Sequence, residues 1–124
     1  MDKLHVAEFI KKSFNNPDER AEFPGTLMET VTLGNFTVFR FTFKPGWRWS
    51  ETLPSIIGTK TCQSEHPVWL IISGRFAVQM DDDGRIEEYG PGDIGMIPPG
   101  HDAWVVGDEP VVAFDIQVIN NNEK

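Results

Sequence analysis

The sequence predicts an all-β protein, folded as a barrel or a two-sheet sandwich, and three observations support this prediction. Apolar residues alternate with period two along much of the chain. Glycine, proline and aspartate interrupt this alternation at short, regular intervals. Only one stretch of the chain has apolar residues at helical spacing. Many short strands with almost no helix are typical of sandwiches, jelly rolls and barrels. A chain of 124 residues forms one domain with a substantial core.

The one helical pattern lies near the N-terminus. Its apolar residues recur at the spacing of a single helix face: Leu4, Val6, Phe9, Ile10 and Phe14. Asp2 can cap the start of this helix and Pro17 ends it. We expect a short N-terminal helix laid against the barrel or a partner, with the helix and a linker together filling residues 1–25.

From residue 26 onward the sequence predicts strands, which form a barrel over 26–118. The first two are expected over 26–33 and 36–43, because Gly34-Asn35 between them is a hairpin signal. Periodicity is weak over 47–65, where we expect a long loop or irregular hairpin. The later strands are short and bounded by glycine or proline turns: 68–73, 75–80, 85–88, 94–97, 103–106 and 111–118. The polar tail, 119–124, is expected to fray.

The acidic composition excludes two classes of partner. The chain carries 19 Asp and Glu against 11 Lys and Arg, which gives a net charge of −8. Nucleic acids and anionic membranes are polyanions that such a surface repels, so we expect neither as a partner.

The cysteine content and the apolar runs indicate a cytoplasmic protein. Cys62 has no second cysteine with which to form an internal disulfide, so the fold does not depend on an oxidising compartment. The N-terminus shows no secretory signal, and the best apolar run, 68–72, is too short to span a bilayer. We therefore expect a soluble cytoplasmic protein.

The turn-rich segment 90–101 carries the most specific motif. Residues 92–100 read Gly-Asp-Ile-Gly-Met-Ile-Pro-Pro-Gly, and His101 follows directly. Glycine adopts backbone angles that other residues avoid, and proline stiffens a turn, so the glycines and prolines of this motif each have a structural role in a turn. This segment resembles the second motif of the cupin superfamily, and the resemblance extends over residues 26–118. It implies a cupin double-stranded β-helix, the jelly-roll barrel, similar to small bacterial single-domain cupins.

The first cupin motif is only partly present. Pro45-Gly46 and Gly74 resemble its two ends, but other residues occupy the usual ligand positions between them. Where the family places histidine or glutamate in its two motifs, this chain has Thr52, Pro54, Pro67 and Ala103. The resemblance therefore implies the fold and leaves the site residues open.

Four residues are candidate metal ligands: His66, His101, Cys62 and Glu51. A cupin metal site needs three or four ligands that converge inside the barrel, and two histidines with a thiolate or carboxylate suit zinc, iron, nickel or manganese. One divalent transition metal is thus the candidate cofactor. The alternative is structural, with the histidines as hydrogen-bonded half-buried residues and Cys62 as a small core residue.

Aromatic residues suggest where a small-molecule ligand would bind. Trp47, Trp49 and Trp104 can line a concave site, and Arg48 between the first two can bind a carboxylate. The competing interpretation places the tryptophans in the core or at a dimer interface and Arg48 in a surface ion pair.

Three functions remain open from the sequence. The first is a small cupin that binds a small molecule, with or without a metal, inside the barrel. The second is a metal-dependent enzyme of the oxygenase, isomerase or lyase type, as cupins often are. The third is a non-catalytic structural or regulatory module, which requires a barrel filled by side chains. A homodimer is expected, because small cupins commonly pair and a dimer would cover the N-terminal apolar residues.

Overall fold

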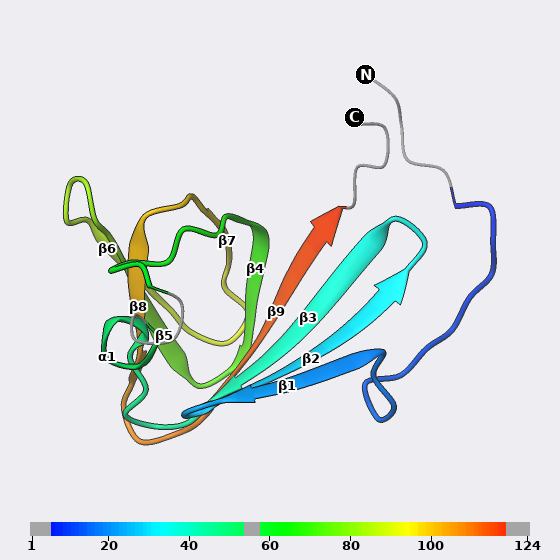
Figure 1. Ribbon diagram of the computed structural model, residues 1–124, viewed down its shortest axis with the longest axis horizontal. Helices are drawn as coiled ribbons and strands as arrows, with labels where there is room; N and C mark the ends of the chain where they lie inside the picture. The colour runs from blue at the N-terminus through cyan, green and yellow to red at the C-terminus, as the bar shows by residue number, and fades with distance from the viewer. Residues whose placement is uncertain (1–5, 54–57, 119–124) are drawn as a thin grey trace.

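The computed structural model describes residues 6–53 and 58–118, and it confirms the predicted all-β fold. A six-stranded sheet has the order β1-β2-β3-β9-β4-β7, and a three-stranded sheet has the order β6-β5-β8. In Figure 1, β4 to β8 close around one end of the molecule, while β1, β2, β3 and β9 extend from it as long ribbons. The strands are β1 (Glu19–Phe23), β2 (Thr26–Leu33), β3 (Phe36–Phe43), β4 (His66–Ser73), β5 (Arg75–Met80), β6 (Ile86–Tyr89), β7 (Ile94–Ile97), β8 (His101–Val106) and β9 (Val111–Val118).

The strands from β2 onward follow the predicted ranges closely. The hairpin β2–β3 turns at Gly34-Asn35 and is in register from the Leu33–Phe36 pair to the Thr26–Phe43 pair. β4 and β8 each begin two residues earlier than predicted, because β7 pairs with the start of β4 and β5 pairs with the start of β8. His66 and His101 are consequently the first residues of their strands.

The predicted N-terminal helix is wrong over the residues that the structure describes. Residues 6–18 contain no helix, while Leu4 and the capping Asp2 lie outside the described residues. Val6 and Phe9 are exposed, and only Phe14 finds an aromatic neighbour, with its ring centroid 5.5 Å from that of Phe114. A helix this short is marginal in water unless its apolar face packs on something. The only helix in the described residues is α1 (Trp49–Thr52), within the predicted loop.

The linker predicted before residue 26 is also corrected. Its second half forms β1, which pairs antiparallel with β2 along the outer edge of the large sheet. Pro24-Gly25 makes the turn, with Gly25 at a φ of +74° that favours glycine. Three of the five residues of this mostly exposed strand are charged, so it lacks the alternating apolar pattern by which the other strands were recognised.

The core lies between the two sheets and is dominated by aromatic side chains. Phe43, Trp47, Trp69 and Phe76 pack on one another, with centroid separations from 4.4 to 6.4 Å. Fully buried aliphatic residues of β4 and β9 complete it. No helix in the described part of the chain is long and apolar enough to cross a membrane.

Candidate functional site

Three chain segments bring Cys62, His66 and His101 together at one end of the core. Their ligand atoms all lie within 4.8 Å of one another. Cys62 is held beside β8 by a backbone bridge in which its N–H donates to the His101 carbonyl at 2.8 Å. The rings of His66 and His101 have centroids 5.3 Å apart and meet edge to face. One thiol and two imidazoles therefore face a common point.

Both histidines are oriented by a hydrogen bond at Nδ1. His101 Nδ1–H donates to the Pro98 carbonyl at 2.9 Å, and His66 Nδ1–H donates to Asp115 Oδ2 at 2.8 Å. Asp115 is 2% exposed and also accepts from the Gln117 side-chain amide. With Nδ1 occupied, Nε2 is the nitrogen that each histidine can offer to the cluster. Metal-binding histidines characteristically have this arrangement, because the second hydrogen bond fixes the tautomer and the ring orientation.

The cluster favours a thiolate beside an imidazolium. Burial opposes ionisation of the thiol, but hydrogen bonds from His101 and His66 outweigh it and lower the pKa of Cys62 to about 6. Burial likewise opposes protonation of His66, whereas its hydrogen bonds to Asp115 and Cys62 raise its pKa to about 9. In the metal-free protein these two groups form an ion pair between roughly these two pH values.

This ion pair predicts the pH dependence of thiol alkylation. In metal-free protein the rate of Cys62 alkylation by iodoacetamide should rise with a midpoint near pH 6, below the ordinary thiol pKa of 9.0. The same two pKa shifts also make the free energy of unfolding depend on pH. The stabilisation that comes from the Cys62 thiolate is lost as pH falls through about 6, and the stabilisation that comes from the His66 imidazolium is lost as pH rises through about 9. Because Cys62 is the only cysteine, the label reports on it alone. A wild-type midpoint near 9 would contradict the ion pair.

A cavity of about 450 Å³ opens beside the cluster and is lined by both sheets. Cys62, His66 and His101 all contribute to its wall. Most of the remaining wall is aromatic, from Phe23, Phe41, Phe43, Trp47, Trp49, Trp69 and Phe76. Gln63 and Ser64, which are exposed, also line it. Concave, largely apolar sites with a few convergent polar groups are the usual form of a small-molecule site.

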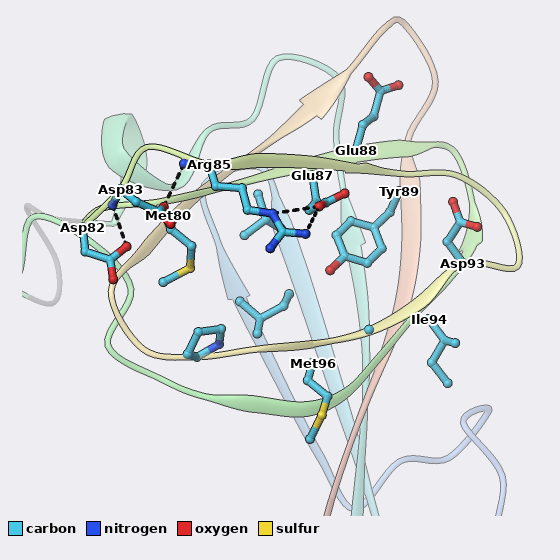
Figure 2. A pocket seen from close by; sticks show the side chains of 14 residues that line it. Met80, Asp82, Asp83, Arg85, Glu87, Glu88, Tyr89, Asp93, Ile94 and Met96 are labelled. Atoms are coloured by element: carbon cyan, nitrogen blue, oxygen red, sulfur yellow. Dashed lines mark hydrogen bonds and ion pairs between the residues drawn. The ribbon is translucent and has the colours of Figure 1, made fainter.

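A larger hollow of about 680 Å³ lies on the outside, between β6 and β7, and Figure 2 shows its lining. Its charged groups are engaged locally: Arg85 pairs with Glu87, Asp83 accepts from the Arg85 backbone N–H, and Asp93 accepts from the Gly90 N–H. Ile94 and Met96 in its wall are exposed. We regard the smaller cavity as the site, because the thiol and both imidazoles face it.

The structure separates the predicted ligand-binding residues into two groups. Trp47 and Trp49 are buried and line the cavity, whereas Arg48 and Trp104 lie outside it. Arg48 donates to Asp102 Oδ2 at 2.9 Å, and its guanidinium carbon lies 4.4 Å from the centre of the Trp104 ring. Alternation along β8 explains the difference, because Asp102 and Trp104 face away from the side on which His101 lies.

The predicted metal ligands are also divided. Cys62, His66 and His101 form the cluster, and Glu51 on α1 is exposed and not part of it. Asp115, whose carboxylate holds His66 in place, was not among the predicted site residues. The alternation along β9 was a sequence signal for this residue, because residues 111, 113 and 115 share the buried face of the strand. A carboxylate on a buried face requires a buried partner.

Comparison with known proteins establishes the fold. The sequence matches no protein-family model and no curated protein. Similar solved structures include KdgF from a Halomonas species, with a TM-score of 0.56 and 16% identity over 84% of this chain and 89% of that chain. A cupin superfamily protein from Desulfitobacterium hafniense has a TM-score of 0.52 and 17% identity over 81% of this chain and 83% of that one.

A third similar structure is a sugar phosphate isomerase of the cupin superfamily from Silicibacter pomeroyi. It has a TM-score of 0.56 and 16% identity, covering 79% of this chain and 62% of that chain. At such identities the likeness concerns the fold alone. The predicted cupin jelly-roll fold is thereby confirmed.

Proposed function

We propose that this cupin-fold protein binds a small molecule in its barrel cavity, beside one divalent transition metal held by Cys62, His66 and His101. The observation that carries the proposal is the matched orientation of the two histidines. Each uses Nδ1 for a hydrogen bond to the protein, which leaves Nε2 available next to a thiol of lowered pKa. A metal needs deprotonated ligands: the Cys62 thiolate supplies one near neutral pH, and the His66 imidazolium would release its Nε2 proton as the metal binds.

The donor set fits a borderline-soft metal. One thiolate and two imidazoles suit zinc, iron or nickel better than magnesium or calcium, which prefer oxygen ligands. Three protein ligands on a four-coordinate ion leave a position open for water or a ligand from the cavity. In that position the metal would supply Lewis acidity to a bound oxygen atom.

The open position also favours the second candidate, a metal-dependent enzyme. A binding protein and an enzyme would share the cluster and the cavity, and would differ in whether the bound molecule is altered. The third candidate required a barrel filled by side chains, and the cavity of about 450 Å³ does not support it.

Formation of a homodimer remains our proposal, which sedimentation at several concentrations tests directly.

We predict a single metal ion per chain. Protein purified without a metal-affinity tag should carry zinc, iron, nickel or manganese by elemental analysis. Metal-free protein titrated with Co²⁺ should develop a thiolate-to-cobalt charge-transfer band that saturates at one ion per chain, because Cys62 is its only thiol. Protein that carries no metal and binds neither Co²⁺ nor Zn²⁺ would overturn the metal site.

A further inference from the structure

We propose that the cavity selects a neutral, planar aromatic molecule with a hydrogen-bond acceptor, such as an aromatic amide, and rejects carboxylates and phosphates. The inference rests on the proposed ligand-binding role of the cavity, and it applies with or without the metal. Three properties of the wall carry it: its charge, its aromatic rings and its unpaired hydrogen-bond donors.

The charge of the site disfavours anions. Among the described residues that line the cavity there is no lysine or arginine. With a divalent metal bound, the Cys62 thiolate and the buried Asp115 carboxylate together balance its two charges. An anion would therefore be buried without a compensating charge, and the net charge of −8 also repels it at long range.

The wall favours a flat ring. Phe43 lies at the centre of an aromatic group, with its ring centroid 4.4 Å from Trp47, 5.1 Å from Phe76 and 6.4 Å from Trp69. All four side chains line the cavity. Aromatic rings gain from stacked or edge-to-face contacts beyond the area that they bury, so a planar ring should bind better than a saturated ring of equal size.

The unpaired donors favour an acceptor on the ligand. In the described structure the indole N–H groups of Trp47 and Trp69 and the hydroxyl of Thr26 have no hydrogen-bond partner. These three residues are 6%, 3% and 8% exposed and line the cavity. An indole N–H can only donate, and a buried donor without an acceptor is costly. A ligand carbonyl oxygen that reached one of these donors would relieve that cost, whereas a hydrocarbon would not.

The test compares three probes of similar size by isothermal titration calorimetry: benzamide, benzoate and cyclohexanecarboxamide. Benzamide should bind saturably to the protein as purified and again after chelation. Benzoate should bind at least about 10-fold more weakly, because it brings an unbalanced charge. Cyclohexanecarboxamide should bind roughly 2- to 12-fold more weakly, because it loses the aromatic contacts.

A matched pair of variants tests the donor. Trp47→Phe keeps an aromatic ring but removes one unpaired N–H, so benzamide affinity should fall roughly 2- to 12-fold. Trp104→Phe changes a tryptophan outside the cavity and should leave the affinity unchanged. Equal effects of the two variants, no binding of benzamide at millimolar concentration, or benzoate binding as tightly as benzamide would each overturn the inference.

Elemental analysis and the cobalt titration separate this inference from the metal site. Selective benzamide binding by a protein that holds no metal would support the inference and contradict the metal site. One metal per chain together with a preference for benzoate would overturn the inference alone.

Discussion

Replacing His101 with alanine is expected to weaken Co²⁺ and Zn²⁺ binding at least about 100-fold. His101 is 3% exposed, and its Nδ1–H bond to Pro98 leaves Nε2 as the nitrogen for the metal. Loss of a group that only positions a ligand typically costs 10- to 100-fold in affinity, so the loss of a ligand itself should cost at least the upper end of that range. Competition with a chelator of known affinity measures the change.

Two further variants make this result specific. Cys62→Ser keeps the size of the side chain and removes the thiolate, so the cobalt charge-transfer band should vanish in the folded protein. Glu51→Gln is the matched control, because Glu51 was a candidate ligand in the sequence and lies outside the cluster. Wild-type affinity in His101→Ala, or an equally large loss in Glu51→Gln, would contradict the assignment. Circular dichroism establishes that each variant is folded.

The fold was largely predictable because its turns carry strong local signals. Gly34-Asn35 marks a hairpin, and the glycine and proline turns on either side of β7 have few conformational alternatives. The N-terminal segment was mispredicted because its local sequence pattern does not decide its structure. Its apolar spacing is helical, but helix formation needs a packing surface, and Val6 and Phe9 remain exposed.

The candidate site was predictable only in part. His101 follows a recognisable turn, and Cys62 lies four residues before His66, so these residue types were visible in the sequence. Their meeting depends on the pairing of β4 with β9 and of Cys62 with β8, which are contacts between distant parts of the chain. Two further contacts, the hydrogen bond between His66 and Asp115 and the ion pair between Arg48 and Asp102, depend on which face of a strand each residue occupies. That face follows from the register in which the strands pair.

Replacing Gly74 with alanine is expected to destabilise the protein by about 3 kcal/mol or more. Gly74 joins β4 to β5, where the chain leaves the large sheet for the small one. Its φ of +81° is rarely adopted by other residues, and an added Cβ would lie 2.4 Å from the Pro110 carbonyl oxygen and 2.9 Å from the Val111 Cα. Both neighbours are backbone atoms, one in the residue before β9 and one in its first residue, so neither can rotate away. Urea denaturation measures the loss as a lower midpoint at an unchanged slope.

A Gly107→Ala variant distinguishes the steric clash expected at Gly74 from the strain of a positive φ. Gly107 has a similar φ of +91°, but nothing lies within 4 Å of an added Cβ. This variant should therefore lose only the conformational part, about 1 kcal/mol. The difference between the two variants then measures how tightly the β4–β5 corner is held against β9. Because β4 carries His66 and β9 carries Asp115, Gly74→Ala should also weaken metal binding in whatever protein remains folded, whereas Gly107→Ala should not. Equal destabilisation by the two substitutions would show that this corner can yield, and that it does not fix the distance between His66 and Asp115.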